Sequence, residues 1–168
     1  MTVRVWPNPD GSCHSRNVAN PTKGPAMRIA DLIARKGSAV LTVPPEAPVS
    51  NLLEVLAERN VGAAVVCEGD RLAGIVSERD VVRHLHHRGA SLLDAPVSEI
   101  MTTVVATCRL QDDVQTLSRT MTERRIRHIP VVDDQERLTG IVSIGDVMKT
   151  RIDQLEEHRD QLEAYISG

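Results

Sequence analysis

Apolar residues follow two alternating patterns along this chain. Short continuous apolar runs predict strands at residues 39–43, 63–67, 71–76, 104–107, 128–132 and 137–142. Between several of these runs, apolar residues recur at helical spacing, as at Val49, Leu52 and Leu56. The resulting order of strand, helix, strand, strand and helix occurs twice. We therefore expect an α/β fold with small mixed sheets.

A short sequence at the end of one predicted strand is repeated later in the chain. GIVSERD at Gly74–Asp80 returns 66 residues later as GIVSIGD at Gly140–Asp146, with five of seven positions identical. Internal duplication of this kind indicates two copies of one structural unit. Because a unit of about 60 residues is marginal alone, we expect the two copies to pack into one module.

The duplication divides the chain into four parts. Residues 27–90 are assigned to the first unit, 91–150 to the second and 151–168 to a final helix. Residues 1–26 contain four prolines, three asparagines and two glycines without periodicity, which predicts a flexible N-terminal tail.

The final helix extends beyond the repeated unit, whereas Gly89 is expected to end the corresponding helix of the first unit. A heptad-like seam follows its length, at Met148, Ile152, Leu155, Arg159, Leu162 and Ile166. Such a helix can cap its own module or contact a second subunit. The length of the seam favours dimer contact.

Composition excludes several classes of function. The net charge is −3 and Trp6 and Tyr165 are the two aromatic residues, which disfavours nucleic-acid binding. No apolar run is long enough to cross a membrane, and the N-terminus lacks a signal-peptide core, so a cytoplasmic protein is expected. Cys67 and Cys108 lie in apolar strand patterns and are predicted to be buried thiols rather than zinc or redox sites.

The repeated Ser-x-x-Asp has two compatible interpretations. At a strand-to-helix junction, this spacing is typical of a helix N-cap, here formed by Ser77 with Asp80 and by Ser143 with Asp146. An aspartate in the first turn after a strand can also accept hydrogen bonds from a ribose diol, and the adjacent helix N-terminus favours phosphate.

The chain resembles a tandem pair of cystathionine β-synthase (CBS) domains. The resemblance is carried by the two motifs, by Ile126–Val132 (IRHIPVV) and by the strand before each first helix. The resemblance covers residues 27–150. It implies two β-α-β-β-α units packed about a pseudo-twofold axis, with two clefts that bind adenosine ligands. It also implies a homodimer without catalytic activity.

The resemblance assigns a role to each matching position. Ribose binding falls to Asp80 and Asp146, beside Ser77 and Ser143. Adenine contacts fall to the backbone of Thr42, Val43, Ala63, Ala64, Thr107 and Ile129. Phosphate contacts fall to Arg127, His128 and Arg79.

The two implied clefts are unequal. Gly62 and Ala63 stand in the first half where Arg127 and His128 stand in the second, so the second cleft is expected to bind a phosphorylated ligand better. His128 is expected to add a pH-dependent contact. AMP is the first expectation, followed by ATP, ADP, NAD and S-adenosylmethionine.

Two functions therefore stay open: a regulatory sensor of an adenosine ligand, with an effector protein as its target, and a ligand-free structural module. An enzyme is disfavoured because no nucleophile–base pair, P-loop or metal cluster is visible. His84 and His87 have the spacing of metal ligands on a helix, but a solvated basic surface is favoured because no carboxylate or cysteine stands at matching spacing.

Overall fold

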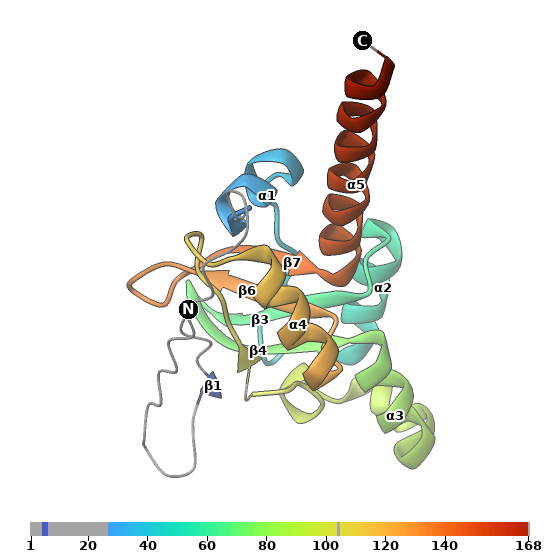
Figure 1. Cartoon of the computed structure of the whole chain (residues 1–168). Coiled ribbons are helices and arrows are strands. Elements are labelled where there is room, and N and C mark those ends of the chain that lie inside the picture. Colours follow the sequence, from blue (N-terminus) through green and yellow to red (C-terminus); the bar gives the residue numbers. More distant parts are fainter. Residues whose placement is uncertain (1–4, 7–26, 104, 168) are drawn as a thin grey trace.

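A computed structural model describes residues 5–6, 27–103 and 105–167 (Figure 1). The first half contains β2 (Thr42–Val43), α2 (Val49–Arg59), β3 (Ala63–Glu68), β4 (Arg71–Ser77) and α3 (Glu78–Arg88). The second half contains β5 (Val105–Ala106), α4 (Val114–Arg124), β6 (His128–Val132), β7 (Leu138–Ser143) and α5 (Ile144–Ser167). Thus the β-α-β-β-α order occurs twice, as the sequence predicts. Helix α1 (Ile29–Lys36) precedes the first half, and two short 3₁₀ turns, η1 (Gly89–Asp94) and η2 (Val97–Glu99), connect the halves.

Each half is built around an antiparallel strand pair. In the first half, β3 pairs with β4, and β2 adds in parallel on the other side of β3. In the second half, β6 pairs with β7, and Cys108 makes an isolated parallel bridge to Val131. The apolar run of β3 is buried throughout Ala63–Cys67, which explains why it lacks polar alternation.

The strand before each first helix is shorter than predicted. A strand is predicted at residues 39–43, but only Thr42–Val43 form one. Within the predicted strand 104–107, only Val105–Ala106 are paired, with β1 (Val5–Trp6), and residue 104 lies outside the described residues. The prediction of a flexible tail over residues 1–26 also lies outside the described residues, except for β1.

The two hydrophobic cores exchange segments. Ile29, Leu32 and Ile33 of α1 precede the first half but are buried in the core of the second. The connection between the halves contributes in the opposite direction, because Leu92, Ala95, Val97 and Ile100 are buried in the core of the first half. Each core is therefore completed by chain from outside its own repeat.

Backbone hydrogen bonds fix this exchange reciprocally. Around α4, Ile29 donates to Asp112 O at 2.9 Å and Val114 donates to Met27 O at 3.0 Å. The corresponding bonds around α2 run from Val97 to Ala47 O at 2.8 Å and from Val49 to Ala95 O at 2.9 Å. The N-termini of α2 and α4 are thus held in the same way by the two exchanged segments.

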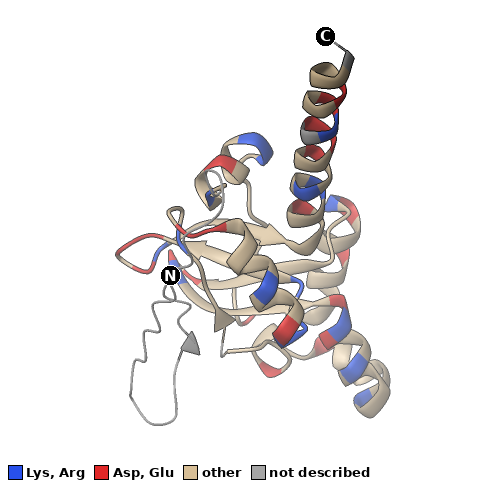
Figure 2. Cartoon of the chain, viewed as in Figure 1, with Lys and Arg blue, Asp and Glu red and all other residues tan. Residues whose placement is uncertain are grey.

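Helix α5 has a buried base and an exposed outer part. Val147 and Thr150 are buried, and the helix begins against β7, α4 and α1. Farther along, the predicted seam is more than half exposed at Ile152, Leu155 and Leu162. Figure 1 shows this part extending away from the rest of the chain, and Figure 2 shows acidic and basic residues along it. The outer part therefore does not cap its own module.

No helix among the described residues is long and apolar enough to span a membrane.

The prediction of buried thiols is confirmed for Cys67 and Cys108. Burial, assisted by the nearby Asp112 carboxylate, raises the pKa of the Cys108 thiol to about 12. Cys108 thus packs within the second core rather than acting as a reactive nucleophile, and burial also raises the pKa of the Cys67 thiol.

Replacing Leu32 tests the exchange. Leu32→Ala should lower the free energy of unfolding by about 2–4 kcal/mol, because it removes a fully packed side chain from the second core. Chemical denaturation measures this change, with Arg35→Ala on the exposed face of the same helix as the control. Equal, small effects of both substitutions would show that α1 is not part of this core.

Candidate functional site

The two Ser-x-x-Asp motifs each connect a strand to the helix that follows it. We call Ser77–Asp80, between β4 and α3, the first junction and Ser143–Asp146, between β7 and α5, the second junction. Asp80 Oδ2 accepts two hydrogen bonds from Ser77, one from the backbone N–H at 2.9 Å and one from the hydroxyl Oγ at 2.6 Å. Asp146 Oδ2 accepts the equivalent bonds from Ser143 at 2.8 and 2.7 Å. The N-cap interpretation is therefore confirmed at both junctions.

Capping leaves part of each carboxylate available. Among the described residues, all hydrogen bonds to the side chains of Asp80 and Asp146 fall on Oδ2. Oδ1 of each aspartate can accept a further hydrogen bond, such as one from a hydroxyl group. Capping and ligand binding are thus compatible at the same residue.

Strand register places the predicted phosphate-binding residues at the second junction. His128 pairs with Ser143 across β6 and β7, and the Ile144 N–H donates to Arg127 O at 2.8 Å. At the first junction, the equivalent pair is Ala63 with Ser77. The structure therefore brings Arg127 and His128 close to Asp146, whereas glycine and alanine occupy the matching positions near Asp80.

Burial and neighbouring charges at the second junction lower the pKa of His128. Burial is the largest cause and lowers the pKa of His128 below its ordinary value of 6.5, and the positive charges of Arg127 and Lys36 add to this. The carboxylates of Asp146 and Glu78 oppose the shift without reversing it. This lowered pKa favours the neutral imidazole of His128.

A lysine that the sequence interpretation did not identify completes this junction. Lys36, the last residue of α1, places Nζ 2.5 Å from Asp146 Oδ2 and 3.0 Å from Ile141 O. Burial raises the pKa of Asp146, but hydrogen bonds from Lys36 and Ser143 prevail and hold it below its ordinary value. Lys36 and Asp146 are 110 residues apart, and no local pattern relates them. Their contact depends on the exchange of α1.

A cavity of about 560 Å³ lies beside β7 and the segment that follows α1. Its lining is Ser38, Val40, Thr42, Cys67, Gly69, Asp70, Asp133, Arg137, Leu138 and Thr139. Of the predicted site residues, only Thr42 lines it. The motif aspartates lie elsewhere, but β7 connects the two places, because Leu138 and Thr139 line the cavity and Ile141 binds Lys36.

Four of the residues predicted to contact adenine do not offer side chains to a ligand. Val43, Ala64, Ile129 and Thr107 are buried, and the first three belong to the two cores. Contacts through their backbone, as the resemblance implies, stay a prediction. Arg79 is exposed at the surface of α3.

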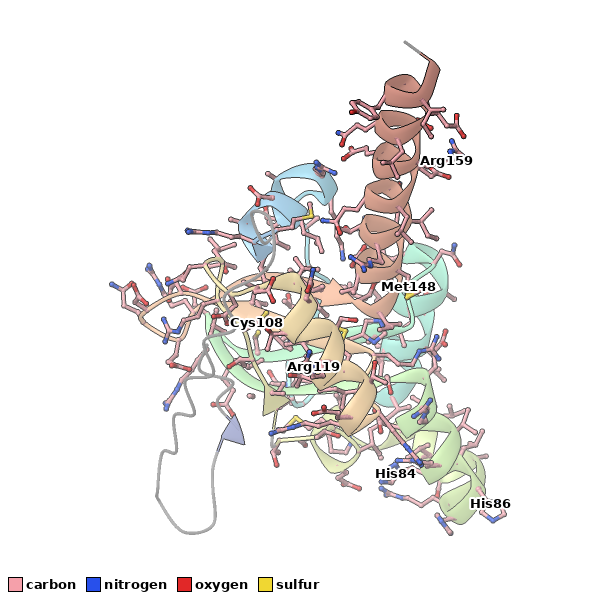
Figure 3. The ribbon with its side chains drawn as sticks, in the orientation of Figure 1. His84, His86, Cys108, Arg119, Met148 and Arg159 are labelled. Carbon is pink, nitrogen blue, oxygen red and sulfur yellow. The ribbon has the colours of Figure 1, made fainter. Side chains whose placement is uncertain are left out.

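The histidines of α3 form no metal cluster with other described residues. His84 Nδ1 lies 2.8 Å from the Asp80 backbone oxygen, and the His86 and His87 rings contact each other edge to face. Figure 3 shows His84 and His86 on this outlying helix.

The lowered pKa of His128 gives a pH-dependent stability. Below about pH 6.5, the unfolded chain binds a proton at His128 more readily than the folded chain does. The free energy of unfolding therefore decreases as the pH is lowered. His128→Gln should reduce the loss between about pH 7.5 and pH 5.5, measured by urea denaturation. His86→Gln, at an exposed position, should leave the pH profile unchanged. An unaltered profile in His128→Gln would contradict the assigned shift.

Comparisons with known proteins agree with this architecture. The sequence model of the CBS domain matches residues 29–87 and 97–153. A mitochondrial CBS domain-containing protein of Arabidopsis thaliana is 35% identical, and the match covers 83% of this chain and 72% of that protein. The crystal structure of a CBS-domain containing protein from Agrobacterium tumefaciens is 38% identical, with a TM-score of 0.72 over 74% of this chain and 99% of the other.

A CBS domain protein from Pyrobaculum aerophilum, solved in complex with AMP, is 29% identical. Its TM-score is 0.64, and the match covers 71% of this chain and 89% of that one. The family match covers most of the chain, and it falls in two segments that correspond to the two repeats. The chain belongs to the CBS domain family and contains a tandem pair of CBS domains.

Proposed function

We propose that this protein is a regulatory module that binds an adenosine nucleotide at the second junction and has no catalytic activity. The observation that carries the proposal is the cluster of Asp146, Lys36, Arg127 and His128 at the start of α5. The carboxylate offers Oδ1 to a ribose hydroxyl, and the two cations and the helix N-terminus favour phosphate.

The similar protein from Pyrobaculum aerophilum, solved with AMP, supports an adenosine ligand. AMP is therefore the first candidate, followed by ATP, ADP, NAD and S-adenosylmethionine. The first junction has Gly62 and Ala63 in place of a cation and a histidine, so it binds a phosphorylated ligand more weakly.

The functional form in this proposal is a homodimer formed through α4 and α5. A groove of about 310 Å³ lies between these helices, with Met27, Val147 and Met148 among its lining residues. Farther along α5, Ile152 and Leu155 of the seam are exposed. Figure 3 shows Met148 at the base of α5 and Arg119 on the adjacent α4. A second copy of the same helices would cover these apolar residues.

In this proposal, the target of the regulation is a separate effector protein. A cytoplasmic location is part of the proposal.

Substituting each motif aspartate tests the ligand site. Asp146→Ala should weaken AMP binding at least tenfold in titration calorimetry, whereas Asp80→Ala should change it less than threefold. Both substitutions remove the bonds between the aspartate and the serine that caps the helix, so Asp80→Ala controls for the loss of capping. Asp146→Ala also removes the bond to Lys36.

The opposite order would assign the stronger site to the first junction. A thermal-shift panel with AMP, ADP, ATP, NAD and S-adenosylmethionine identifies the ligand, because a ligand that binds only the folded state raises the melting temperature. If no compound changes the melting temperature of the wild-type protein, the ligand-free structural function is correct instead.

Shortening α5 tests the dimer. Removing residues 152–168 should shift sedimentation velocity profiles toward the monomer, because the exposed seam is lost. Leu155→Asp should have the same direction of effect, whereas Glu157→Gln, outside the seam, should not. A dimer that sediments identically after truncation would rule out the role of α5.

A further inference from the structure

Lys36 binds a backbone carbonyl whose equivalent in the first repeat is bound by a backbone N–H group. In the first half, Ile75 O accepts a backbone hydrogen bond from Thr102 N at 2.8 Å, and Thr102 O accepts one from Ile75 N at 3.0 Å. In the second half, the equivalent carbonyl is that of Ile141, and the Lys36 ammonium binds it at 3.0 Å. Lys36 and Thr102 are 66 residues apart, as are Ile75 and Ile141. A side-chain cation thus replaces a neutral backbone N–H at one of two equivalent places.

The ammonium group retains one donor for a ligand. A lysine ammonium has three N–H donors, and two of those of Lys36 go to Asp146 Oδ2 and Ile141 O. The Lys36 side chain is 30% exposed, so the third donor can reach an incoming group. Since Lys36 binds Oδ2, Asp146 Oδ1 stays available to a ribose hydroxyl. Lys36 therefore need not leave when a ligand binds.

Charge balance around Asp146 depends on this lysine. Two cations, Arg127 and Lys36, and two carboxylates, Asp146 and Glu78, act on His128, and their charges sum to zero. Without Lys36 the same set carries a net charge of −1 and repels a phosphate dianion. Among the described residues, the side chain of Asp80 at the first junction is hydrogen-bonded to Ser77 alone.

We infer that Lys36 determines the ligand specificity of the second junction. It selects adenosine ligands that carry a phosphate over uncharged adenosine and over S-adenosylmethionine, whose sulfonium and ammonium groups give it a net positive charge. The inference rests on the proposed function and extends it, because it assigns the discrimination to one side chain delivered by α1. Lys36 acts as a specificity-determining residue through its third N–H donor and its charge.

Titration calorimetry with AMP, adenosine and S-adenosylmethionine tests this inference on the full chain. In Lys36→Met, the ratio of AMP affinity to adenosine affinity should fall at least tenfold, with adenosine affinity changed less than threefold. Affinity for S-adenosylmethionine should rise. Lys36→Gln, which can still donate a hydrogen bond to Asp146 but has no charge, should behave in the same way and serves if Lys36→Met does not fold.

Arg35→Met is the matched control, because it removes one positive charge from an exposed neighbouring position of the same helix. Its AMP-to-adenosine ratio should equal that of the wild type. An unchanged ratio in both Lys36 variants overturns this inference and leaves the proposed function standing. A parallel loss of AMP and adenosine affinity also overturns it, because Lys36 would then only support the fold. If the wild-type protein binds none of the three compounds, both the inference and the proposed function fail.

Discussion

The exchange of segments between the two halves is the constraint on which the rest of the structure depends. The chain has no phenylalanine, and both of its aliphatic cores are completed by chain from outside their own repeat. Helix α1 completes the second core, and the connection after α3 completes the first. Reciprocal backbone bonds at the starts of α2 and α4 hold both segments in place. Neither half can therefore keep its packing without the other.

The same exchange makes the two junctions chemically different. Because α1 packs on the second core, its last residue, Lys36, reaches Asp146, whereas Thr102 occupies the equivalent place in the first half. Helix α1 also contacts α5, which begins at the second junction and carries the exposed seam. The proposed ligand site and the proposed dimer surface thus share α5, which α1 contacts, and this gives a short physical route between a ligand and the assembly.

Local patterns predicted much of the fold. Buried runs such as Ala63–Cys67 and His128–Val132 identified the central strands, and the repeated Ser-x-x-Asp identified both caps. The contact of Lys36 with Asp146 could not be predicted, because it depends on which core α1 enters, and apolar spacing within α1 is the same in either case. The strand predicted at residues 39–43 contains β2 but is too long, and Val40 lies beside a cavity lined by residues of both halves.

A crystal structure of the protein grown with AMP would test the central claim, that the two junctions are unequal and the second binds the nucleotide. The account predicts AMP with its ribose on Asp146 and its phosphate beside Lys36 and Arg127, and weaker or no occupancy at Asp80. AMP bound with its ribose on Asp80 and absent from Asp146 would contradict it.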